Sequence, residues 1–415
     1  MTNAAIIESI FRSESGRIIA SLIRVSRSFD LAEEALQDAL AAALIHWSTA
    51  GVPENPSAWI TAVARRKLID YARREQTRRS SEDQLQYEMS NSPGSMNAEL
   101  DMTAPGEDDR LRLIFTCCHP ALNQEAQVTL TLRTLGGLTT SEIGRAFLIS
   151  ETTLAQRIVR AKRKIQQARI PYEVPSEKAL PQRLSAVQTV LYLIFNEGYS
   201  ASSGDSLIRR ELCSEAIRLA RTLCELMPAP AENLGLLALM LLHDSRRDTR
   251  VSSGGELVPL DEQDRTRWNG LAIEEGLKLI DCALRRRDVG PYQLQAAIAA
   301  VHAEAKTAVA TDWKQIALLY KELAGLQASA IIALNYAVAI AMSEGPGRGL
   351  ILLDQLGSSG ELESYYLYHA SRADLLRRLR RKEEATVAYQ RALSLTANGI
   401  ERRYLLRRLN ELIDS

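Results

Sequence analysis

The stretch Leu138–Lys164, LTTSEIGRAFLISETTLAQRIVRAKRK, decides how the first part of this chain folds. It predicts two short helices joined by a tight turn. Ser150 suits the N-cap of the second helix, because its hydroxyl can accept a hydrogen bond from the first helical turn. Apolar residues then recur at helical spacing and predict a single buried stripe, formed by Leu154, Ile158, Ala161 and Ile165. The pattern is typical of a helix-turn-helix.

The opposite face of the second helix is polar and basic. Side chains near the start of such a helix can reach base edges in a DNA major groove, and later cations can hold phosphates. The residues expected to contact DNA are Thr152, Thr153, Gln156, Arg157, Arg160 and Lys164. A basic helix face is also often merely solvated, and the turn position that usually holds glycine is Leu148.

Composition predicts an all-α protein with two or three domains in its 415 residues. The net charge is zero, so only a local concentration of cations can indicate a polyanionic partner. The odd number of cysteines, five, indicates reduced thiols in a cytoplasmic protein. Residues 323–343 carry no charge, but their alanines and amides favour a buried helix over a membrane span. We therefore expect a soluble protein with no membrane partner.

The first 80 residues predict three helices. One covers residues 5–26, and the second, DLAEEALQDALAAALIHW, begins at Asp30 as its expected N-cap. This second helix is predicted to bury Leu36, Leu40 and Leu44 and to expose Glu33, Glu34, Gln37 and Asp38. The third is predicted to start with Asn55 as N-cap and Pro56 at its first position, and it is rich in arginine.

AEEALQDAL and NPSAWITAVARRKLIDYARR resemble region 2 of a sigma-70 family RNA polymerase sigma factor, and the helix-turn-helix resembles region 4. Two such domains without a third between them resemble the extracytoplasmic-function (ECF) group. The resemblance implies region 2 over residues 1–80 and region 4 over residues 111–170. It implies core RNA polymerase and promoter DNA, at the −35 and −10 elements, as partners, without a cofactor.

The resemblance also implies residue roles. Glu33, Glu34, Gln37 and Asp38 stand where sigma factors bind the clamp of core polymerase. The positions that hold the −10 element are matched by Trp59, Arg65, Arg66, Lys67, Arg73 and Arg74. The residues expected to contact DNA on the helix-turn-helix stand where region 4 reads the −35 element. The alternative for the acidic residues is ordinary surface charge on a helix.

Residues 81–110 predict a flexible acidic linker, because residues 82–109 hold eight acids and no Lys or Arg. It is either a solvated tether or, as in the family, a negative strand in a basic channel of polymerase. Cys117, Cys118 and His119 follow. Adjacent cysteines rarely bind one ion together and no second pair follows at zinc spacing, so we interpret them as packing residues and expect no metal site.

Residues 171–415 predict a helical C-terminal domain, with two late stretches that resemble tetratricopeptide (TPR) repeats. The stretches YLIFNEGYSASSGD, LLHDSRRDTR and QDRTRW match the C-terminal extension of one ECF group. Gly198 is expected to cap a helix, and the polar residues of these stretches to form structural networks. The domain is expected either to regulate the first two domains through a stiff joint at residues 170–175, or to dock an unknown protein or ligand.

Two functions remain open from the sequence. The first is a promoter-specificity subunit of RNA polymerase with a fused regulatory domain. The second is a helical scaffold or transcription regulator that binds DNA or proteins without acting as a sigma subunit. We expect no enzyme, because the chain contains no P-loop, GxSxG, HExxH or Rossmann fingerprint.

Overall fold

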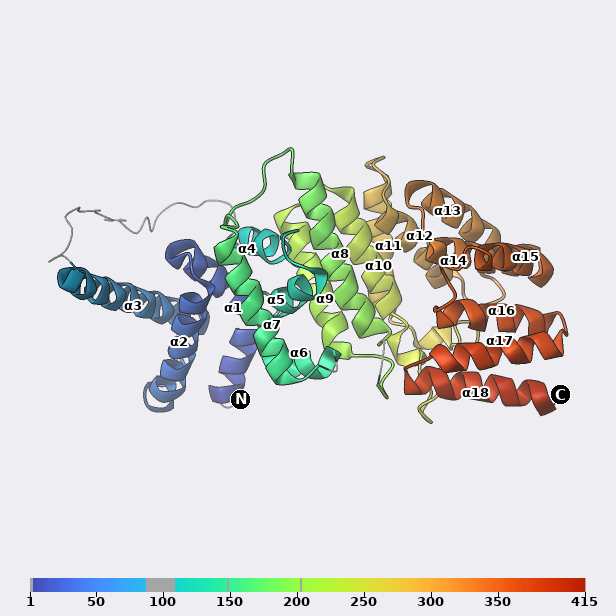
Figure 1. The fold of residues 1–415 in the computed structure, drawn as a ribbon, viewed down its shortest axis with the longest axis horizontal. Coiled ribbons are helices and arrows are strands. Elements are labelled where there is room, and N and C mark those ends of the chain that lie inside the picture. Colours follow the sequence, from blue (N-terminus) through green and yellow to red (C-terminus); the bar gives the residue numbers. More distant parts are fainter. Residues whose placement is uncertain (1–2, 87–108, 148, 202–203, 415) are drawn as a thin grey trace. The chain divides into compact units, whose positions relative to one another are not determined.

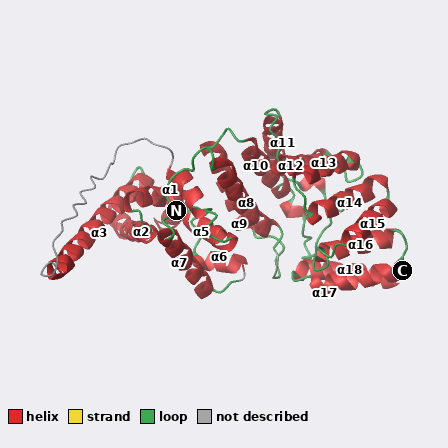
Figure 2. Ribbon diagram, turned by 45° about the horizontal axis from the view of Figure 1, so that its top comes forward, coloured by secondary structure: helices red, strands yellow, loops and turns green. Residues whose placement is uncertain are grey.

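The computed structural model describes residues 3–86, 109–147, 149–201 and 204–414. The described residues form helices and no strand, which confirms the all-α prediction (Figure 2). The chain divides into two compact units, residues 1–190 and residues 191–415, and the boundary falls inside one helix, α8 (Leu180–Tyr199). No helix in the described ranges is both long and apolar enough to span a bilayer.

Three helices open the first unit: α1 (Asn3–Ser26), α2 (Phe29–Ala50) and α3 (Pro56–Gln86) (Figure 1). Asn55 caps α3 as predicted, since its Oδ1 accepts from the Ala58 amide at 3.0 Å. The predicted cap of α2 was wrong. The N-cap is Ser28, whose hydroxyl accepts from the Leu31 amide at 3.3 Å, so Asp30 lies inside the first turn. Because α3 continues to Gln86, residues 81–86 are helical; residues 87–108 of the expected linker lie outside the described residues.

The second helix packs through a stripe of mostly small residues. Its buried side chains are Phe29, Ala32, Ala35, Leu36, Ala39, Ala43 and Trp47. Leu44 was expected in this stripe but is 48% exposed, because Ala43 and Trp47 occupy the inner face instead. The small residues allow α1 and α3 to approach closely, and α2 contacts both.

Four short helices follow: α4 (Asp109–Cys117), α5 (Gln124–Thr134), α6 (Thr140–Phe147) and α7 (Glu151–Gln167). The helix pair α6–α7 is the predicted helix-turn-helix, and the Ser150 hydroxyl caps α7 by accepting from the Thr153 amide at 3.2 Å. The entire predicted stripe of α7 is buried. Cys117 and Cys118 are packing residues as interpreted, with their sulfurs next to the Thr134 and Thr131 hydroxyls.

The segment after α7 is tied to both parts of the first unit. The buried Tyr172 hydroxyl donates to the Ala20 carbonyl of α1 at 2.8 Å and lies 3.2 Å from the Asp109 carbonyl at the start of α4. Burial raises the pKa of this phenol, so it remains a neutral donor. At the start of α8, the Arg183 guanidinium donates to the Phe115 carbonyl at 2.5 Å. Residues 180–190 therefore pack with the first unit.

The second unit is a succession of helices. After α8 they are α9 (Arg210–Leu226), α10 (Ala231–Asp244), α11 (Gly270–Leu284), α12 (Pro291–Glu304), α13 (Trp313–Leu326), α14 (Ala330–Glu344), α15 (Pro346–Gly357), α16 (Tyr366–Arg378), α17 (Lys382–Leu395) and α18 (Gly399–Asp414).

These helices surround three clusters of buried side chains, centred on α10–α12, on α12–α14 and on α14–α18. The helix pairs α14–α15 and α16–α17 are hairpins, and α14 begins at Ala330 and α16 at Tyr366, close to a 34-residue period.

Gly198 does not cap α8, which corrects the expectation. The helix continues to Tyr199, and Gly198 is a point of close approach, where an added Cβ would lie 2.7 Å from the Cys213 amide nitrogen. The polar stretches do form structural networks as interpreted. In one network, Arg250 lies over the Tyr199 ring at 3.8 Å and Arg247 pairs with Asp244 at 2.6 Å.

Candidate nucleic-acid interface

The outer face of α7 is the candidate surface for reading DNA. The buried stripe fixes which side of α7 faces outward. Because Leu154 and Ile158 pack inward, the residues on the opposite side of the helix point away from the core. The residues that the structure leaves exposed on this helix include Thr152, Thr153, Gln156, Arg160 and Lys164. Five of the six predicted residues therefore lie exposed on one helix.

Arg157, the sixth predicted residue, has a different environment. Its guanidinium forms an ion pair at 2.8 Å with Glu125 in the first turn of α5, and its side chain is 26% exposed. The pair uses part of the donor capacity of the guanidinium and draws the side chain toward the start of α5. Arg157 is therefore less available to a base than the exposed residues of α7.

A second basic surface runs along α3. Arg66 and Arg73 are exposed and stand seven residues apart, which places them on one side of the helix. Arg65 is partly buried, and Lys67 lies 3.6 Å from the Asp38 carboxylate of α2. The side chain of Arg74 lies outside the described residues. The arrangement can attract a phosphate backbone along the exposed side of α3.

Trp59, at the start of α3, is only partly exposed because two rings from α2 pack against it. The His46 ring stacks on it with a centroid distance of 5.5 Å and an interplanar angle of 8°. The buried Trp47 meets it edge-on at 5.6 Å. These contacts make Trp59 a rigid aromatic residue, and a base that stacked on the same face would have to displace His46.

The four predicted polymerase-binding residues of α2 do not share one environment. Glu34 and Gln37 are exposed. Asp38 accepts a hydrogen bond from the Tyr71 hydroxyl at 2.7 Å, besides its contact with Lys67. Glu33 was expected on the surface but its side chain is only 16% exposed, which is the main correction to the predicted set.

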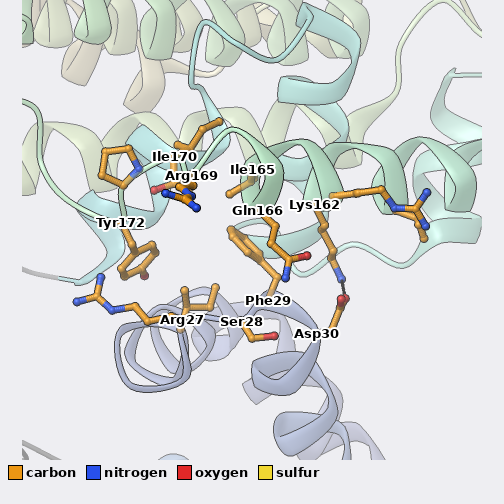
Figure 3. Close-up of a pocket in the computed structure, with 15 residues that line it drawn as sticks. Arg27, Ser28, Phe29, Asp30, Lys162, Ile165, Gln166, Arg169, Ile170 and Tyr172 are labelled. Carbon is orange, nitrogen blue, oxygen red and sulfur yellow. Dashed lines mark hydrogen bonds and ion pairs between the residues drawn. The ribbon is translucent and has the colours of Figure 1, made fainter. Parts of the chain in front are cut away.

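Glu33 is half-buried, and Lys162 of α7 contacts it. The Lys162 ammonium lies 3.0 Å from the Glu33 carboxylate and 2.9 Å from that of Asp30, and the Lys162 side chain is 12% exposed. Figure 3 shows the ion pair of Lys162 with Asp30, which lies beside a cavity between the α1–α2 turn and the last turns of α7. The volume of this cavity is about 540 Å³. The Phe29 and Ile165 side chains also line the cavity.

The structure therefore joins the inner side of α7 to one predicted polymerase-binding residue, Glu33, through Lys162, which was not among the predicted site residues. Its position, one residue after the expected buried residue Ala161, was the only signal in the sequence. The inner side of α7 holds the acidic start of α2, while its outer side remains exposed.

Comparison with known proteins gives three family matches in this chain. Residues 10–78 match the model for sigma-70 region 2, residues 112–165 match a model for sigma-70 region 4, and residues 183–284 match a family of unknown function, DUF6596. An uncharacterized protein of Rhizobium meliloti (strain 1021) is 42% identical over 414 residues, covering 99% of this chain and 97% of the relative. No solved structure matches the chain.

Proposed function

Because this chain belongs to the sigma-70 family, with region 2, region 4 and a C-terminal extension, we propose that it is an RNA polymerase sigma factor of the ECF type. In this proposal it binds core polymerase and directs initiation at one class of promoter in the cytoplasm, without a cofactor. The observation that carries the proposal is the exposed outer face of α7, presented by a helix whose inner stripe is buried. The C-terminal extension, expected over residues 171–415, is proposed to hold a TPR-like regulatory domain, and its own compact unit begins at residue 191.

In this proposal, each binding role is assigned to residues that the structure leaves exposed. Thr152, Gln156 and Arg160 contact base edges of the −35 element, while Lys164 contacts its phosphates. Arg66 and Arg73 hold the backbone at the −10 element. Glu34 and Gln37 face the basic clamp of core polymerase, and Glu33 joins them once Lys162 releases it.

Binding to core polymerase separates this function from the alternative, a scaffold or regulator that binds DNA or proteins without polymerase. We expect the purified chain to bind core polymerase and to support transcription from its promoter. Glu34→Lys with Gln37→Lys should weaken this association at least tenfold, about 1.4 kcal/mol, because two cations would then face a basic surface. The measurement is an affinity titration of labelled chain with core enzyme.

Glu177→Lys is the matched control, since Glu177 is an exposed acid outside the three helices of the first domain. It should bind core polymerase as the wild-type chain does. A wild-type chain that does not bind core polymerase would support the scaffold alternative. A double variant that folds and binds with unchanged affinity would remove Glu34 and Gln37 from the interface.

A further inference from the structure

We infer that the C-terminal unit contains a binding pocket for a small organic monocarboxylate with an apolar body. A cavity of about 340 Å³ lies among residues of α8, α10, α12, α13 and α14 and the segment before α11. Pockets for small molecules have volumes of about 300–1,000 Å³. The cavity therefore suits a small molecule and is too small for a folded peptide. The inference does not depend on the proposed sigma activity.

Apolar side chains form part of the pocket wall. The α12 helix contributes Ile298 with two small residues, Ala299 and Ala303, that leave room in front of the helix. Leu323 of α13 and the indole of Trp268 complete the buried part of the wall. Such walls favour the carbon skeleton of a ligand.

The polar groups of the pocket carry one positive charge. Arg246 is the cation, and no Asp or Glu stands among the described residues that line the cavity. Its guanidinium contacts the His243 Nδ1 at 2.9 Å, which requires His243 to accept through that nitrogen. Burial lowers the pKa of His243 far below its usual range, and burial with the nearby arginines lowers the pKa of His302 to about 3. Both imidazoles are therefore neutral at pH 7.

Two of these lining residues also keep a buried nitrogen that has no hydrogen-bond partner within the described part of the chain. They are Arg246, through Nε, and His302, through Nδ1. Buried polar atoms are nearly always paired, so two such atoms on the wall of one cavity leave positions that a bound molecule can pair. A cation with no carboxylate among the described residues that line its cavity gives the same indication.

One available cation matches one negative charge on the ligand. Arg265 is also close, but its guanidinium already donates to the carbonyls of His302 and Ala305 at 2.6 and 2.7 Å and to the Thr311 hydroxyl at 3.0 Å. A doubly charged phosphate would thus meet only one available guanidinium, whereas a carboxylate is matched by it. Tyr320, whose pKa burial raises to about 12, adds a neutral hydroxyl that can donate to the same group.

The test is calorimetric titration of the full chain with benzoate and phenylacetate, and with their neutral amides, benzamide and phenylacetamide. We expect the carboxylates to bind with a Kd of roughly 1 mM or tighter, and the amides at least about tenfold more weakly. Arg246→Gln should weaken carboxylate binding at least about tenfold and Arg246→Lys by less, because lysine keeps the charge but not the planar donors. Ala303→Phe should abolish binding of all four probes by filling the cavity.

Arg267→Gln is the matched control, because Arg267 is exposed and does not line the pocket; its affinities should equal those of the wild-type chain. The proposal is overturned if neither carboxylate binds the wild-type chain, or if acids and amides bind equally. It is also overturned if Ala303→Phe leaves carboxylate binding unchanged, since the site would then lie elsewhere. The comparison of acid with amide uses the wild-type chain alone, so it decides the question even if a variant fails to fold.

Discussion

Gln156 and Arg157 are neighbours on α7, but the fold gives them different surroundings. Arg157 is paired with Glu125, whereas the Gln156 side chain is exposed on the outer face. We therefore expect Gln156→Ala to lose discrimination at a single −35 base pair, worth about 1–3 kcal/mol. Fluorescence anisotropy with promoter duplexes that differ by one base pair measures this loss.

Lys164→Ala tests a phosphate contact on the same helix, in contrast to the base contact of Gln156. Lys164 is exposed one turn beyond Arg160, where a cation contacts phosphates. This variant should weaken binding to all duplexes alike and reduce the salt slope by about one unit. If Gln156→Ala also weakened every duplex equally, Gln156 would not be part of the reading face.

His302 makes the stability of the second unit depend on pH. Its pKa is about 3 in the folded chain and about 6.5 in an unfolded one, so below pH 6.5 the unfolded chain binds one more proton. The free energy of unfolding should therefore fall as the pH falls from 6.5 toward 3, by up to about 1.4 kcal/mol per pH unit from this residue. Urea unfolding at pH 7, 6 and 5 measures the slope.

His302→Gln should make this slope shallower, because glutamine does not titrate. His46→Gln is the matched control, since His46 is exposed in the first unit. A slope that His302→Gln leaves unchanged would contradict the neutral, buried state assigned to His302.

At the scale of elements, the contact between α2 and α7 depends on Lys162. Its ammonium is close to both Asp30 and Glu33, and its removal leaves the Glu33 carboxylate partly buried without its cation. Lys162→Ala should therefore weaken the α2–α7 contact by about 1.5–3 kcal/mol. If that contact covers part of the polymerase-binding face, the variant should bind core polymerase more tightly than the wild-type chain. The affinity titration described above measures this gain.

Lys164→Ala is again the control, because it removes an exposed lysine from the same helix. It should leave the affinity for core polymerase unchanged. A Lys162→Ala variant that remains folded and binds core polymerase no more tightly would show that Glu33 is structural and not part of that interface.

At the scale of the molecule, the expected regulatory role of the C-terminal extension can be tested by truncation. Residues 180–190 pack with the first unit, through Arg183 and Leu184, so a chain cut at the Pro175 joint would lose part of that unit's packing. A chain that ends at Val190 keeps these contacts. We expect its promoter activity with purified core polymerase to differ from that of the full chain by about 5–150-fold, the usual range of coupling between sites.

The alternative is a platform that recruits another protein and does not affect initiation directly. In that case the chain ending at Val190 should transcribe as the full chain does in the purified system. A melting curve of the truncated chain, compared with the first transition of the full chain, confirms that the first unit remains folded.

Features that depend on neighbours along the chain could be predicted from the amino-acid sequence alone. The buried stripe of α7 follows from helical spacing, and the caps at Asn55 and Ser150 follow from side chains that reach amides three residues later. The same local reasoning was wrong at Asp30, because Ser28 supplied a competing hydroxyl two residues earlier. The family motifs were also local patterns, and the matches to regions 2 and 4 confirm them.

Which charged side chains remain available depends on how the helices pack against one another. Lys162 and Arg157 belong to one basic run, yet each is paired with an acid more than thirty residues away in the chain. The pocket around Arg246 is likewise assembled from helices that are separated in the sequence. Helical periodicity shows which side of a helix is apolar but not which element covers it. An ion pair or a cavity depends on the element that covers the helix. Neither can therefore be predicted until the packing of the helices is known.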